Sequence, residues 1–121
     1  MRHEEYNSFC ASLPHATHVV QWGGAHVWKV GGKVFAIGGR NEGEKLAVTF
    51  KCSDIAYDIL REQPGLRPAP YLASRGMKWI QRLSSEAMDD AALKEYLLQS
   101  YRLVAAGLPR KVQRELGLAK T

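Results

Sequence analysis

The chain has 121 residues and a mass of 13.5 kDa, the length of one globular domain, so a single domain over residues 1–121 is expected. Hydrophobic residues make up 45% and charged residues 24%, which argues against a collagen-like repeat, a disulfide scaffold, a long coiled coil or wholesale disorder. The formal net charge is +5, and the basic excess falls after residue 60. Such a charge attracts polyanions or acidic surfaces, and it also keeps a small domain soluble.

The N-terminal segment is predicted to form a helix that ends at Pro14. Tyr6, Phe9, Cys10 and Leu13 recur at helical spacing and form one apolar stripe. The segment has no apolar stretch typical of a secretory signal, and no run in the chain approaches the roughly 18 apolar residues of a membrane span. A cytoplasmic protein without a membrane partner is therefore expected.

Strand-like sequence follows the first helix. Residues 18–22, 26–30 and 33–37 are rich in β-branched and aromatic side chains, and a Gly-Gly pair separates the last two runs. Two glycines between such runs predict a β-hairpin, because both turn positions need positive φ. With a two-residue loop, Trp28 is expected opposite Phe35.

The middle of the chain combines one more strand with a short helix. Residues 46–51 alternate clearly, with Leu46, Val48 and Phe50 on one side. Ser53 is placed to cap a helix that ends before Pro64. The proline-rich stretch 64–77 is predicted to be a loop.

The C-terminal third contains a further strand at 78–83, a long amphipathic helix from about Asp89 to Gly107 and a short basic helix at 110–116. The predicted order is α–β–β–β–β–α–β–α–α. Short connections between consecutive strands favour antiparallel pairing. The expected architecture is a two-layer α+β domain, in which helices cover a mainly antiparallel meander of four strands plus a fifth.

These segments resemble the MmcQ/YjbR family of small bacterial proteins over about residues 3–118. The matching pieces are Leu13-Pro14, the hairpin 28–36, where Val34 replaces the usual Met, and residues 46–54, 70–72, 78–80, 100–104 and 108–111. The resemblance implies a YjbR-like fold related to frataxin-like (CyaY-like) domains. Family members are commonly labelled DNA-binding because the fold has a double-wing arrangement, and no catalytic residues carry over.

Several residue patterns could in principle form a metal, phosphate or thiol site, but their spacing supports none of these. His15, His18 and His26 have loose spacing and no convincing acidic partner for a metal. The glycines of residues 38–45 lack the spacing of a phosphate loop. Cys10 and Cys52 form no CxxC pair and are expected to be buried. The sequence therefore predicts a non-enzymatic protein without cofactor or metal.

Basic residues at the strand ends and turns are the strongest functional candidates. We expect them to form a continuous cationic surface for weak, sequence-independent DNA binding through phosphates. Trp28 and Trp79 are expected in the core rather than at this surface. Two alternatives stay open: an adaptor that binds a protein or peptide at the open sheet face or an edge strand, and a small-molecule binder with a pocket under the 64–77 loop. The predicted DNA-binding residues are Lys29, Lys33, Arg40, Lys45, Lys78 and Arg82.

Overall fold

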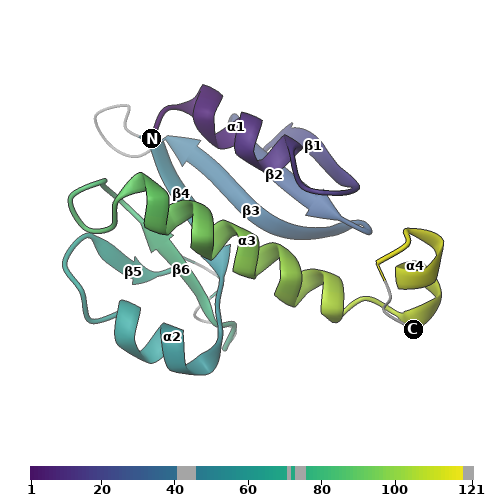
Figure 1. The fold of residues 1–121 in the computed structure, drawn as a ribbon. Coiled ribbons are helices and arrows are strands. Elements are labelled where there is room, and N and C mark those ends of the chain that lie inside the picture. Colours follow the sequence, from purple (N-terminus) through teal and green to yellow (C-terminus); the bar gives the residue numbers. More distant parts are fainter. Residues whose placement is uncertain (41–45, 71, 73–75, 119–121) are drawn as a thin grey trace.

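A computed structural model describes residues 1–40, 46–70, 72 and 76–118 of the chain. The elements follow in the order α1 (His3–Ala11), β1 (Ala16–Gln21), β2 (Ala25–Val30), β3 (Lys33–Arg40), β4 (Leu46–Lys51), α2 (Asp54–Leu60), β5 (Leu66–Pro68), β6 (Trp79–Arg82), α3 (Asp90–Ala106) and α4 (Arg110–Glu115) (Figure 1). The strands form one six-stranded sheet in the order β1-β2-β3-β4-β6-β5, and every neighbouring pair is antiparallel. The predicted α+β class and antiparallel sheet are confirmed.

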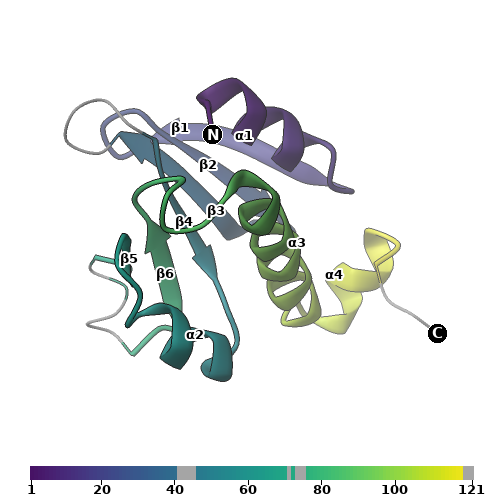
Figure 2. The same ribbon diagram turned by 60° about the vertical axis from the view of Figure 1, so that its left-hand side comes forward.

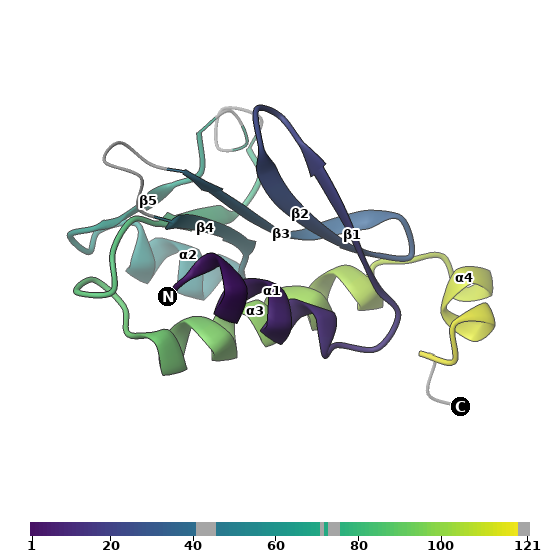
Figure 3. The ribbon, with the colours of Figure 1, turned by 90° about the horizontal axis from the view of Figure 1, so that it is seen from above.

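The helices lie on one side of this sheet. Figure 3 shows α1, α2 and α3 beneath the strands, and none of the described helices lies on the opposite face. In Figure 2, α4 lies beyond the C-terminal end of α3, far from β5. Each strand therefore has a helix-covered face and an open face, and alternate residues belong to each.

The core fills the space between the sheet and α3. Leu46, Val48 and Phe50 lie on the helix-covered face of β4, as the alternation predicts. The Phe50 ring stacks on Tyr96 with centroids 5.3 Å apart. Phe35 meets Tyr101 edge to face at 5.4 Å. These buried aromatic contacts hold α3 across β3 and β4.

Side-chain caps begin two of the helices. Ser53 accepts a hydrogen bond from the backbone N–H of Ala56 at 3.2 Å, which confirms the predicted cap of α2. Asp89 accepts one from Ala92 N–H at 2.7 Å at the start of α3. Each cap satisfies a backbone donor that has no partner within its helix.

Two local features differ from the sequence prediction. The predicted loop 64–77 contains the short strand β5, because an edge strand tolerates Pro68, which cannot donate to a sheet ladder. The predicted pairing of Trp28 with Phe35 is wrong. A β-bulge between the pairs Lys29–Val34 and Trp28–Ala36 leaves Phe35 without a partner on β2.

The bulge places Gly38 of β3 directly under the Tyr6 ring of α1, where an added Cβ would collide with ring carbons. Gly38→Ala should therefore lower the free energy of unfolding by about 1–3 kcal/mol, the usual effect of overpacking a core. Gly39→Ala is the matched control, since its Cβ would lie 3.8 Å from Ala25, an ordinary contact. Urea denaturation of both variants checks this, and equal stability would contradict the close approach of α1.

Candidate cationic surface of the open sheet face

One row of paired residues crosses the whole open face of the sheet. The backbone register joins one residue from each strand, in the order Arg67, Gln81, Thr49, Ile37, Val27 and Val19. Cross-strand partners point to the same side of a sheet, so these six side chains share one face. Polar side chains occupy the β5, β6 and β4 end of the row, and apolar ones occupy the β3, β2 and β1 end. Within the row, Val27 and Thr49 are buried, so the accessible part consists of the other four.

Three cations lie on this face: Lys29 on β2, Lys51 on β4 and Arg67 on β5. Arg67 donates its Nε–H to Gln81 Oε1 at 2.7 Å, which orients the guanidinium on the sheet. Within the described part of the chain, none of the three forms an ion pair with a carboxylate.

The spacing of these cations follows from the sheet geometry. Lys29 lies two residues beyond Val27, and Lys51 lies two residues beyond Thr49, on strands that run in the same direction. Both residues are therefore displaced toward the same end of the sheet. Two strand spacings separate β2 from β4, which is roughly 10 Å. Arg67 is two further strands away, so the three cations span most of the sheet width.

Acidic residues are absent from all six strands that the structure describes. The strand sequences contain six lysines and arginines and no aspartate or glutamate. Several acidic residues lie instead in the first turns of helices, where the helix dipole favours them, as with Glu4, Glu5, Asp54 and Asp90. The two layers of the fold therefore differ in charge.

The structure does not bring the predicted DNA-binding residues together on one surface. Lys29 pairs with Val34 on the open face, whereas Lys33 pairs with Val30 and so belongs to the other face. Lys78 lies on the helix side, with Nζ 4.7 Å from the centre of the Tyr57 ring. Arg40 ends β3, but its side chain lies outside the described residues, as does the whole of Lys45.

Arg82 is 1% exposed, which corrects the expectation that it contributes to a cationic surface. Its Nε and Nη2 groups donate to the backbone oxygen of Met88 at 3.0 and 2.7 Å, and Nη2 also donates to Asp90 Oδ1 at 2.8 Å. The Arg82 guanidinium and the Met1 amino group hold the pKa of Asp90 below its usual range. Arg82 thus anchors the start of α3 to β6.

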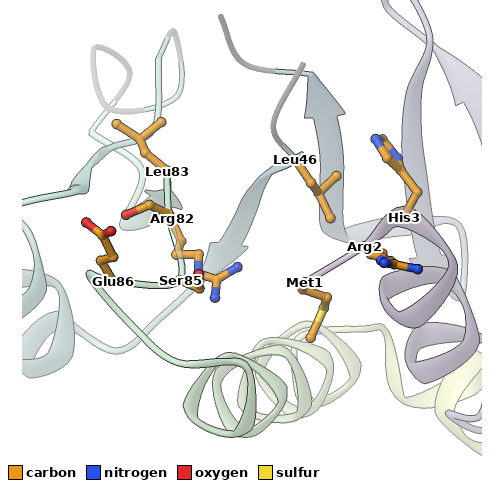
Figure 4. A pocket seen from close by; sticks show the side chains of 9 residues that line it. Met1, Arg2, His3, Leu46, Arg82, Leu83, Ser85 and Glu86 are labelled. Atoms are coloured by element: carbon orange, nitrogen blue, oxygen red, sulfur yellow. The ribbon is translucent and has the colours of Figure 1, made fainter. Parts of the chain in front are cut away.

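A pocket lies next to this anchor. It has a volume of about 380 Å³ and lies between residues 1–3, Leu46 and residues 82–86. Figure 4 shows the Arg82 guanidinium extending toward Met1. This location differs from the predicted pocket under the 64–77 loop. Because Arg82 is already bonded to Met88 and Asp90, its role here is structural.

The three tryptophans differ in burial. Trp28 and Trp79 are buried, as expected. Trp22, however, is 65% exposed and has a φ of 52° in the turn after β1. A bulky residue rarely adopts this left-handed conformation. The sequence pattern places Trp22 at the end of the strand 18–22, and its position before Gly23-Gly24 is the one signal for an exposed turn residue.

His18 and His26 make structural contacts, and both cysteines are buried. His18 stacks on Trp28 with centroids 4.7 Å apart, and its Nε2 lies 2.9 Å from His26 Nδ1, so the two imidazoles hydrogen-bond to each other. Among the described residues, no three His, Cys, Asp or Glu side chains are placed to hold a metal ion. Burial raises the pKa of the Cys10 thiol to about 12 and that of Cys52 to about 11.

The fold therefore defines a class of α+β proteins with helices on one face of an open antiparallel sheet. The chain belongs to the YjbR family, whose model matches residues 11–103. It is similar to a Deinococcus radiodurans protein with a DUF419 domain, at TM-score 0.78 and 23% identity, covering 96% of this chain and 88% of that one. It is also similar to a Pseudomonas syringae protein, at TM-score 0.68 and 16% identity, covering 86% of this chain and 99% of that one.

A comparison with curated proteins gave no match. The two solved structures share too little sequence with this chain to carry more than its fold. None of the described helices is long and apolar enough to cross a membrane. The function of this chain is therefore inferred from the geometry of its sheet.

The Arg82–Asp90 pair predicts a specific dependence of stability on pH. Because the pKa of Asp90 is depressed in the folded state, its contribution to stability is present above the unfolded-state pKa of roughly 3.9 and is lost as the pH falls through the folded pKa. Asp90→Asn should therefore lower the melting temperature at pH 7 and lose less on acidification than the unmodified chain does. Melting curves at neutral pH and about pH 3 measure this.

Asp89→Asn is the matched control for that experiment. It removes one neighbouring negative charge and keeps a side chain that can cap α3. Its acid-induced loss of stability should stay close to that of the unmodified chain. Identical behaviour of the two variants would contradict the assigned role of Asp90.

Proposed function

We propose that this YjbR-family protein binds DNA through phosphate contacts made by Lys29, Lys51 and Arg67 across the open face of its sheet. The observation that supports this most directly is the charge pattern of the strands, which carry cations and no acidic residue. These three cations lie on the one face that α1, α2 and α3 leave uncovered. Displacement of counterions from phosphates is the main source of sequence-independent affinity for nucleic acids.

The contacts proposed here read the backbone rather than the bases. Three cations spaced by about two strands can each meet a different phosphate, and the half-buried Gln81 side chain between them can donate to a phosphate or sugar oxygen. No recognition helix on the open face is part of the proposal, so sequence preference should be small. The expected affinity is weak and depends strongly on salt.

We further propose that the protein acts by binding and not by catalysis. The high pKa values of Cys10 and Cys52 keep both thiols protonated near neutral pH, so neither is a ready nucleophile. His18 and His26 hydrogen-bond to each other, and Arg82 is fixed by Met88 and Asp90. These groups have roles in the fold that account for their positions.

Neutralising the open face should weaken DNA binding and flatten its dependence on salt. Each phosphate contact contributes about −0.9 to the slope of log K against log salt for duplex DNA, so three contacts give a slope near −3. The double variant Lys29→Gln, Arg67→Gln should reduce the magnitude of that slope by about 2. Fluorescence anisotropy with a labelled random-sequence duplex, titrated at several salt concentrations, measures it.

The matched control is the double variant Lys111→Gln, Arg114→Gln on α4. It changes the net charge by the same amount at two exposed positions away from the open face. Its slope should remain near that of the unmodified chain. Equal effects of the two double variants would mean that net charge alone drives binding, and absence of binding at low salt would remove the proposal.

A further inference from the structure

The two edges of the sheet are protected to very different degrees. The β5 edge is three residues long and carries Arg67 and Pro68, both typical guards against pairing with another strand. The β1 edge is six residues long, with the sequence Ala-Thr-His-Val-Val-Gln, and contains no lysine, arginine, acidic residue or proline. Its outward backbone groups are therefore open to another strand.

Apolar side chains are exposed on both faces of this edge. Val19 lies on the open face and is 37% exposed, and Val20 lies on the helix-covered face and is 52% exposed. Trp22, just beyond the strand, is the most exposed of the three. Exposed apolar residues gathered on one element are typical of interaction surfaces.

Val20 is exposed although α1 contacts both β1 and β3 on this side of the sheet. The Tyr6 hydroxyl donates to the backbone oxygen of His26 on β2 at 2.8 Å, and its ring lies against Gly38 on β3. Asn7 Oδ1 accepts from Trp28 Nε1 on β2 at 2.9 Å. These contacts direct Tyr6 and Asn7 toward β2 and β3, and Val20 of β1 stays exposed beside them.

We propose that β1 pairs antiparallel with β1 of a second copy of this chain, forming a twofold dimer with one continuous twelve-stranded sheet. A twofold axis through Val19 or Val20 places odd-numbered residues opposite odd ones and even opposite even ones. Open-face residues then meet open-face residues, as antiparallel pairing requires. Each copy thus covers the exposed valines on β1 of the other copy with its own β1.

Charge also favours a second copy as the occupant. Two molecules of net charge +5 repel one another, so an interface between them must avoid further cations. β1 contains no lysine, arginine, aspartate or glutamate, unlike β2, β3, β4, β5 and β6, each of which contains a lysine or arginine. A strand selected to receive an acidic peptide would carry the complementary cations.

The helices leave room for this arrangement. Three strand spacings separate β2 from its symmetry mate across the paired edges, roughly 14 Å. Packed helices need about 8–10 Å between their axes, and Tyr6 and Asn7 of α1 reach inward to β2 and β3, so this spacing fits two α1 helices side by side. The guarded β5 edges then end the dimer sheet on both sides, which favours a closed dimer over a filament.

Dimerisation would join the open faces of the two copies into one surface. On the proposed function, on which this consequence alone rests, that surface would carry both sets of Lys29, Lys51 and Arg67. The dimer itself is tested without nucleic acid, so its failure and the failure of DNA binding are distinguishable.

Cysteine crosslinking tests the pairing directly. Opposed Cα atoms in antiparallel strands lie about 4.5–5.5 Å apart, within the range that a disulfide bridges. Val19→Cys or Val20→Cys should therefore form a covalent dimer in oxidised glutathione, since both native cysteines are buried. Ile55→Cys on α2 is the control, because Ile55 is 76% exposed and remote from β1. Crosslinking of neither β1 variant above this control would overturn the proposal.

Sedimentation velocity over a range of concentrations tests the free dimer. Val20→Lys should raise the dissociation constant at least about tenfold, because two lysines would meet near the axis. Ile55→Lys, the same change at an exposed helix position, should leave the constant unchanged, and circular dichroism checks that both variants are folded. A monomer at all concentrations, or a dimer that persists equally in Val20→Lys, would overturn the proposal, as would displacement of the dimer by a foreign peptide at β1.

Discussion

The register of the sheet decides which side chains of this protein can meet a ligand. Helices cover one face only, so a shift of one residue in any strand exchanges its buried and exposed sets. The bulge at Phe35 makes such a shift within β3, because it turns Gly38 toward Tyr6 and places Ile37 in the open-face row. Without the bulge, α1 could not lie this close to the sheet. The arrangement of the open face follows from the same shift.

The difference in charge between the two layers has a simple physical origin. Asp and Glu are disfavoured in strands and favoured in the first turns of helices, where they meet free backbone N–H groups. Lysine and arginine can extend past a sheet surface and keep their charge in water, so strands accept them more readily. With helices on one face only, a modest net charge of +5 becomes a cationic sheet backed by acidic helix ends.

Features that depend on local sequence patterns, namely strand alternation, a helix cap and a turn, could be predicted from the sequence. The alternation of Leu46, Val48 and Phe50, the Ser53 cap and the Gly31-Gly32 turn, with φ of 58° and 80°, appear as expected. The candidate site was predicted less well. Lys29 lies near the Gly31-Gly32 turn, where the sequence places it, and is half-buried on β2. Burial of Arg82 depends on Met88 and Asp90, which local spacing does not reveal. Lys51 and Arg67 could be assigned to the open face only once the cross-strand pairs were known.

β1 has no lysine or arginine, whereas every other strand has at least one, and this difference links the architecture of the sheet to its proposed function. On an edge strand that faces only solvent, a charged residue would increase the solubility of the protein at little cost in stability. Yet β1 has no lysine, arginine, aspartate or glutamate, exposes Val19 on one face and Val20 on the other, and is followed by Trp22 in a left-handed conformation that costs free energy. The same sheet concentrates cations on its other strands. An edge strand without lysine or arginine lies next to a cationic face. This arrangement suits two separate contacts, self-association along β1 and binding of an anionic partner across the remaining strands.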